Sequence, residues 1–319
     1  MHSILLITPD FLIILMGAFI TWKLGYPKQF WQWTEKLVFY ILFPPLLFTS
    51  IATSKLSFGE SSQFLIVALI TMSIGVLMAW GVRFVVRSDN ISHASIFQCG
   101  FRFNAYIGFA LCSRIFGEEG FALLALIMAF WVPISNTLAV GVLAHAVAQA
   151  HPERAGGNGA LAILASTLKA VFKNPLIVAT LLGLAVNVSE IQIPKVGLDF
   201  MQHLGKASLA MGLLCIGAGL EANGLLRNIR LLLAGATVRL VLIPCVAVAL
   251  SWLTGLPGVA AGVLIIFAAL PTGQSCYVMT ANMGGNAPIV ANITTLQTLA
   301  AMLTLPMWME VMNYLLPLI

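Results

Sequence analysis

The chain has 319 residues, of which 60% are hydrophobic and only 8% are charged. Soluble domains carry about 25% charged residues, so the composition argues against a soluble enzyme and against a nucleic-acid-binding protein. The formal net charge of +5 is instead typical of loops that face anionic lipid. We therefore expect an all-α polytopic membrane protein whose surroundings are the lipid bilayer.

The first apolar stretch, residues 3–22, lacks a basic start and a small-residue cleavage site, so we expect a retained membrane helix. Later in the chain, residues 240–309 contain no Asp, Glu, Lys or Arg. One helix of that length would measure about 100 Å, far more than a bilayer accommodates, so this region must fold back at its Gly and Pro turns. The same reasoning predicts ten spans, near residues 3–22, 34–54, 62–86, 92–115, 119–148, 168–188, 197–220, 227–252, 257–283 and 287–316.

The distribution of basic residues predicts the orientation of these spans. Loops that follow odd-numbered spans carry ten Lys and Arg residues with their flanks, whereas loops that follow even-numbered spans carry three. Cytoplasmic loops are enriched in Lys and Arg. We therefore expect a multi-pass protein of the cell (inner) membrane with both termini outside the cytoplasm.

An internal repeat is indicated by matches at an offset of 166–167 residues. Pro9 aligns with Pro175, Gly17 with Gly183, and Gly117 with Gly284, and proline and glycine are turn or helix-breaking residues. We expect a first five-helix repeat at 1–150, a cytoplasmic linker at 151–167 and a second five-helix repeat at 168–319. Because five is odd, the two repeats would have inverted topology, as in many secondary transporters.

Two spans carry signals for an interrupted helix at matching positions. Asn104, between Gly100 and Gly108 in the fourth span, aligns with Pro271 in the ninth span at an offset of 167. A proline removes an amide donor and clashes with the preceding turn, and Gly273 adds backbone freedom. We predict that both spans are broken there and that the new helix N-termini favour an anion. The alternative is that Pro271 only kinks its helix.

Polar residues near these breaks are the candidate substrate contacts. They are Arg102, Asn104, Asn136, Pro271, Thr272, Gln274 and Ser275. A second group of polar residues is predicted to have either a coupling role or a structural role. Buried amides also hold membrane helices together, and ionisable side chains cost free energy inside the membrane. This second group comprises Arg239, Asn292, Thr295 and Gln297. Two interpretations of Arg102 remain: it holds a substrate carboxylate, or its side chain extends from the cavity to the membrane interface. For Arg239 a structural role is favoured.

At these residues the chain resembles the auxin efflux carrier family, within the larger group that also contains the bile acid–sodium symporters. The resemblance is carried by Arg102-Phe103-Asn104 with Gly108, by Ala269-Leu270-Pro271, and by residues 173–177 and 209–217. It implies broken fourth and ninth spans that cross, with Asn104 and Pro271 at the crossing and Asn136 as a substrate contact. It also implies a transport domain of spans 3–5 and 8–10 and a scaffold of spans 1, 2, 6 and 7 that forms a homodimer.

The resemblance further implies transport of small organic anions, carboxylates such as auxin-like or malonate-like compounds, by elevator-type alternating access. A sodium-coupled bile-acid-like symporter is the alternative, but no acidic residue lies at the predicted crossing, since Glu118 and Glu119 lie beyond it. An intramembrane enzyme is a distant alternative, because Gly273-Gln274-Ser275-Cys276-Tyr277 lacks the final glycine of a nucleophile elbow. A third alternative is a receptor or assembly scaffold that does not transport.

Neither a cofactor nor a metal is expected. The five cysteines are scattered and form no C-x-x-C pair, which is typical of buried packing residues and not of a zinc site or a disulfide framework.

Overall fold

The computed structural model describes residues 2–53, 58–150, 174–189, 191–221, 228–256 and 258–315. These residues are helical or lie in turns and connections, with no strand among them. Helices satisfy every backbone group within one segment, which is why apolar runs of this kind adopt them in a membrane. The predicted linker at 151–167 lies outside the described residues.

Several helical stretches in this part of the chain are long and apolar enough to cross a membrane. They are Lys28–Ala52, Ser62–Val85, Asn90–Ala150, Ile229–Thr254 and Ala287–Tyr314, and two shorter apolar helices are Pro175–Val188 and Gly258–Ala269. The stretch Asn90–Ala150 has 61 residues, about 90 Å as one helix, so it holds more than one crossing. These helices are consistent with a polytopic membrane protein; the number of ten spans stays a prediction.

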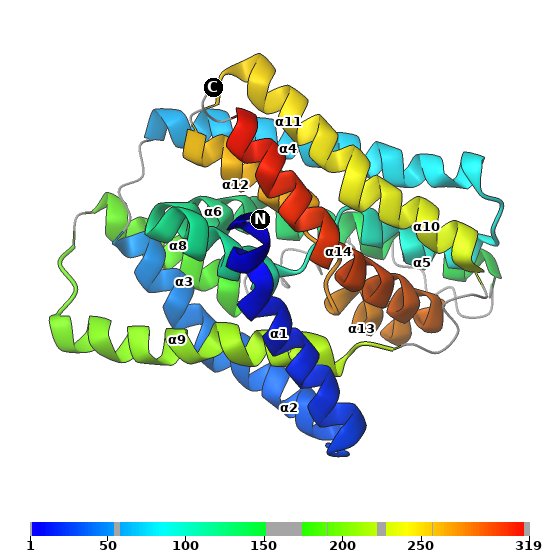
Figure 1. Ribbon diagram of the computed structural model, residues 1–319, viewed down its shortest axis with the longest axis horizontal. Coiled ribbons are helices and arrows are strands. Elements are labelled where there is room, and N and C mark those ends of the chain that lie inside the picture. Colours follow the sequence, from blue (N-terminus) through cyan, green and yellow to red (C-terminus); the bar gives the residue numbers. More distant parts are fainter. Residues whose placement is uncertain are drawn as a thin grey trace. The chain divides into compact units, whose positions relative to one another are not determined.

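The chain forms two compact units, and each takes segments from both halves of the sequence. The first comprises Met1–Leu65, Ala105–Phe130 and Ala170–Leu220. Its helices are α1 (His2–Lys23), α2 (Lys28–Leu37), the π-helical η1 (Val38–Leu42), α3 (Phe43–Ala52), α8 (Pro175–Val188) and α9 (Lys195–Ala218). Within this unit α1 packs against α9 and α3 packs against α8 (Figure 1).

Two glycines allow these helix pairs to approach closely. A Cβ atom on Gly17 of α1 would lie 2.1 Å from the carbonyl oxygen of Leu214 in α9. A Cβ atom on Gly183 of α8 would lie 2.8 Å from the carbonyl oxygen of Phe48 in α3. Small residues at such contacts are typical of membrane helix packing, where dispersion forces drive association.

The second unit comprises Ile66–Asn104, Trp131–Lys169 and Glu221–Ile319. It holds most of α4 (Phe58–Val85), the second part of α6 (Ala105–Ala150), and the elements α5 (Asn90–Phe97), η2 (Gln98–Gly100), α10 (Ile229–Thr237), η5 (Val238–Leu242), α11 (Ile243–Thr254), α12 (Gly258–Ala269), α13 (Ser275–Asn282) and α14 (Ala287–Leu315). Helix α12 is its core, since every residue from 260 to 269 is buried, and it packs against α11 and α14.

Local sequence explains two features of this unit. Pro244 has no amide to donate to the Leu240 carbonyl one turn earlier, and the indole of Trp308 donates to that carbonyl instead, at 2.8 Å. Asp89 caps α5 by accepting a hydrogen bond from the amide of Ser92 at 2.8 Å. Burial favours the neutral acid, but hydrogen bonds from Ser92 outweigh it and hold the pKa of Asp89 below its usual range.

Both predicted helix interruptions are present. Helix α5 and its 3-10 extension η2 end at Gly100, residues 101–104 lie outside any helix, and α6 begins at Ala105. In the same way α12 ends at Ala269, residues 270–274 lie outside any helix, and α13 begins at Ser275. A further kink divides α6 at Gly117, whose φ of 64° is in the left-handed region that glycine tolerates.

Candidate functional site

The two interruptions meet within the second unit. The amide of Asn104 donates to the carbonyl of Pro271 at 2.8 Å. A Cβ atom on Gly273 would lie only 2.6 Å from the carbonyl oxygen of Phe103, so the two backbones touch there. Non-helical backbone at membrane depth is tolerated where protein satisfies its polar groups, and here each interruption supplies partners to the other. We call this contact between residues 101–104 and 270–274 the crossover.

Arg102 is buried at the crossover with neutral partners. It is 8% exposed, and it donates to the Gln98 side-chain oxygen and to the Ser275 hydroxyl, both at 2.9 Å. Its Nη1 also lies 3.1 Å from the Met279 sulfur. No carboxylate among the described residues pairs with it. A buried cation without a counter-ion is costly, and the α13 N-terminus beside it adds positive potential, so this position is suited to an anion.

Gln297 joins both interruptions from α14. Its side-chain oxygen accepts from the Thr272 amide at 2.9 Å, and its side-chain nitrogen donates to the Cys99 carbonyl at 3.4 Å. The Thr272 hydroxyl lies 3.2 Å from the Cys276 sulfur. Gln297 therefore satisfies backbone groups that the interruptions leave without helical partners.

Arg239 lies in η5 and is fully buried. Its Nε donates to the Leu270 carbonyl at 2.6 Å and its Nη2 donates to the Phe267 carbonyl at 2.9 Å. The last carbonyls of a helix have no intrahelical partner and carry the negative end of the helix dipole. Arg239 therefore caps the C-terminal end of α12, a contact that suits the structural role favoured for it.

The remaining candidates lie in different surroundings. Gln274 is half-buried and Ser275 is exposed, while the Thr295 hydroxyl accepts from the Glu221 amide at 2.9 Å. Asn136 is half-buried on α6 and Asn292 is buried on α14. In the described part of the chain no hydrogen bond joins Asn136, Asn292 or Thr295 to the crossover, so their assignment to a site stays a prediction.

Gln98 and Thr280 lie beside the crossover and were not predicted from the sequence. The Gln98 side-chain nitrogen donates to the Thr280 hydroxyl at 2.8 Å, and its oxygen accepts from Arg102. One signal was available, because Gln98 and Arg102 are four residues apart and so share a helix face. Nothing local indicates Thr280, which lies 182 residues away from its partner.

Comparison with known proteins agrees with this architecture. Residues 3–309 match the sequence model of the family described as Membrane transport protein. An uncharacterized transporter of Methanothermobacter thermautotrophicus is 25% identical over 290 residues, which cover 87% of this chain and 88% of that protein. Because the match covers nearly the whole chain and its apolar helices fit a multi-pass protein, the chain belongs to the membrane transport protein family, that of the auxin efflux carriers.

Proposed function

We propose that this protein is a secondary transporter that moves small organic anions, carboxylates of auxin-like or malonate-like kind, across the cell membrane. The observation that carries the proposal is the buried guanidinium of Arg102, whose partners at the crossover are all neutral. Membership in a transport family argues against the alternative of an intramembrane enzyme.

The donor geometry of Arg102 suits a carboxylate. A guanidinium has five N–H groups in a planar fork, and its partners among the described residues use three of them, two on Nη1 and one on Nη2. The two that remain are on Nε and Nη2. An arginine binds a carboxylate through two parallel hydrogen bonds when it presents two donors on one edge of the fork. The exposed neighbour Ser275 gives the site an approach from the surface of its unit.

An inverted repeat underlies the transport mechanism that we propose. If a two-fold axis relates the halves, each contact should recur at the repeat offset. The contact of Gly17 with Leu214 does recur as the contact of Gly183 with Phe48, at shifts of 166 in both directions. Residues near such an axis should also contact their own equivalents. Asn104 and Pro271 do so, as do Met72 and Arg239, which are 167 residues apart.

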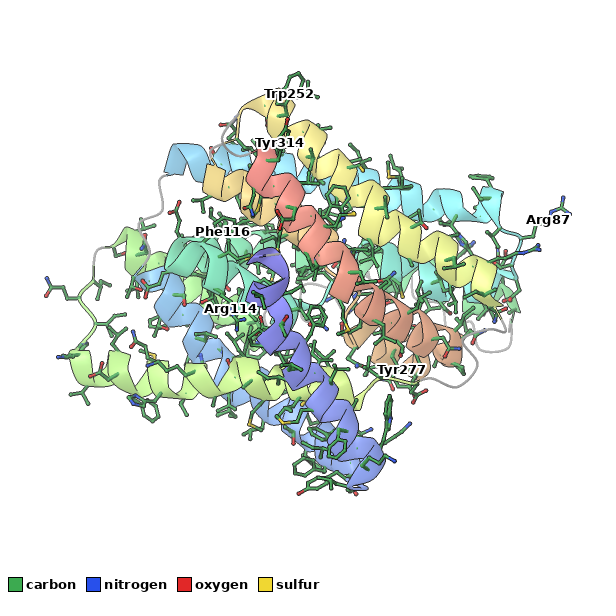
Figure 2. All side chains as sticks on the ribbon, viewed as in Figure 1. Arg87, Arg114, Phe116, Trp252, Tyr277 and Tyr314 are labelled. Carbon is green, nitrogen blue, oxygen red and sulfur yellow. The ribbon has the colours of Figure 1, made fainter. Side chains whose placement is uncertain are left out.

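Elevator-type alternating access follows from this architecture. In the proposal, spans 3–5 and 8–10 carry the bound anion as a moving domain, and spans 1, 2, 6 and 7 form a scaffold that dimerises. Both termini lie outside the cytoplasm. Within the second unit, Trp252 and Tyr314 lie at one end and Arg87 lies at the other (Figure 2), which suits the aromatic and basic residues expected at opposite interfaces.

The test is anion flux in vesicles that contain the purified protein. We expect carboxylate counterflow by the native protein, and a loss of about 10–100-fold with Arg102→Gln, since hydrogen bonds to charged groups contribute about 1.5–3 kcal/mol. Arg102→Lys keeps the charge but not the fork and should be intermediate. Arg87→Gln, at an exposed position, is the matched control and should transport normally.

Two outcomes decide the substrate class and the coupling. A carboxylate that binds the native protein should raise its melting temperature by mass action, and Arg102→Gln should abolish that shift. Equal flux by Arg102→Gln and the native protein would overturn the anion site. Flux that requires sodium would favour the bile-acid-like symporter, and flux that is independent of sodium at two pH values would favour uniport.

A further inference from the structure

Two cysteines face each other across the crossover, one on each broken helix. Cys99 is in η2, directly before the first interruption, and Cys276 is the second residue of α13, directly after the other. Both side chains are completely buried. The Cys99 thiol lies beside the Cys276 thiol, close enough for the two side chains to interact. Nothing in the proposed transport site uses these thiols.

Neighbouring contacts hold together the two segments that carry these cysteines. On one side of Cys99, Gln98 donates to the Thr280 hydroxyl at 2.8 Å. Beyond it on the other side, Arg102 donates to the Ser275 hydroxyl at 2.9 Å. The segment 98–102 is thus connected to the segment 275–280 at both ends, with the cysteines between the two connections.

We propose that Cys99 and Cys276 form a reversible disulfide bond that locks the crossover. The bond would join the two broken helices covalently, beside the crossover where their backbones touch. The bond itself is independent of what the protein carries, whereas the arrest of transport that we expect from it rests on the proposed function. A disulfide requires Cα atoms about 4.4–6.8 Å apart, so formation of the cross-link reports whether the two cysteines reach that separation.

The chemistry needs a small oxidant, and hydrogen peroxide is sufficient. One thiolate attacks a peroxide oxygen, the O–O bond breaks, and a sulfenic acid forms with release of hydroxide, which a proton converts to water. The second thiolate attacks the sulfenic sulfur, the S–S bond forms, and the hydroxyl group leaves as a second water. Two thiols thus lose two electrons and two protons, and one peroxide becomes two waters. Arg102 and Arg239 supply positive charge near Cys276, where the anionic sulfur reacts.

The other cysteines provide internal comparisons. Cys112 and Cys215 belong to the first unit and are buried, whereas Cys245 lies on α11 and is exposed. An oxidant that acted by exposure alone would modify Cys245 first. Selective loss of the two buried crossover thiols therefore separates a paired site from general oxidation.

The test is a thiol count on the full-length Cys245→Ser protein in detergent, before and after hydrogen peroxide. After denaturation and alkylation, we expect two of its four thiols to be lost, a cross-linked peptide that joins Cys99 to Cys276, and full recovery with dithiothreitol. The melting temperature should rise on oxidation. Cys99→Ser should show no cross-link and no rise, and Cys112→Ser should behave as its parent.

The proposal is overturned if both crossover thiols stay alkylatable, or if they oxidise without a cross-link. The same oxidised sample in vesicles tests the arrest, because carboxylate counterflow should fall at least tenfold and return with dithiothreitol. A cross-link with unchanged counterflow would refute the arrest. Absence of counterflow in the reduced protein would refute the proposed function and leave the thiol count to decide the disulfide.

Discussion

Arg102 and Arg239 are both buried guanidinium groups, and their partners assign them different tasks. Arg239 donates to two backbone carbonyls at the end of α12, so its charge complements a helix dipole. Arg102 donates to side chains of Gln98 and Ser275, which are neutral and can rearrange. A fixed backbone contact suits a structural tie, whereas adaptable side-chain contacts suit a group that must bind and release a ligand.

Replacing Arg239 by methionine should therefore lower stability without removing transport. Arg239→Met removes the donor to the Leu270 carbonyl and one of two donors to the Phe267 carbonyl, which also accepts from the Leu270 amide at 3.4 Å. An unsatisfied buried group costs about 1–3 kcal/mol, so we expect the free energy of unfolding to fall by about that amount, seen as a lower melting temperature. Counterflow per folded molecule should stay within about twofold of the native rate, a change that corresponds to less than about 1 kcal/mol. A normal melt with lost counterflow would instead make Arg239 a transport residue.

At the scale of elements, the crossover depends on backbone proximity at Gly273. Its α-carbon faces the Phe103 carbonyl, and an added Cβ would lie 2.6 Å from that oxygen. That oxygen belongs to the first interruption, and the hydrogen bond from the Asn104 amide to the Pro271 carbonyl joins the same two segments. The short half-helices α12 and α13 are thus positioned by this contact as much as by their own side chains.

Gly273→Ala should separate the two interruptions. Overpacking of this kind costs about 1–3 kcal/mol, and we expect a lower melting temperature together with weaker carboxylate binding in a thermal-shift titration. Gly81→Ala on α4 is the matched control, because a Cβ there meets nothing within 4 Å. Alanine in that helix should leave binding unchanged and stabilise by about 0.5–1 kcal/mol. Equal melting temperatures for the two variants would refute the tight contact.

The sequence predicted these elements where the cause is local. Pro271 lacks an amide and Asn104 lies among glycines, so both interruptions were predictable from a few neighbouring residues. Side-chain partners were not, because Gln98 bonds to Thr280 from 182 residues away and Gln297 reaches Cys99 from 198 residues away. For the same reason, periodicity could not decide whether Gln297 contacts a substrate or satisfies the Thr272 amide.

At the scale of the whole molecule, the proposed inverted repeat would explain how one sequence pattern produces matching contacts. Helix α1 is span 1 and packs against α9, which is span 7, while α3 is span 2 and packs against α8, which is span 6. Replacing each span of the first pair by its equivalent in the other repeat gives the second pair. Gly117 and Gly284, aligned by the repeat, both have a positive φ, of 64° and 77°. In this proposal each half has five spans, and that odd number would make the second repeat cross the membrane in the opposite direction.

That topology has a direct test in the sidedness of two exposed positions. Arg87 follows α4 and Thr254 ends α11, and the positive-inside rule places the first in the cytoplasm and the second outside. In a Cys245→Ser background, which removes the exposed native thiol, we expect a membrane-impermeant maleimide added to intact cells to label Thr254→Cys. Arg87→Cys should react only after permeabilisation.

The two possible failures of this labelling test have different meanings. The reverse pattern would preserve the ten spans and invert the molecule in the membrane, which would overturn only the orientation. Labelling of both positions from the same side would require an even number of crossings between them, whereas the predicted spans 4–8 place five there. That result would remove the inverted topology, and with it the reason for proposing alternating access around the crossover.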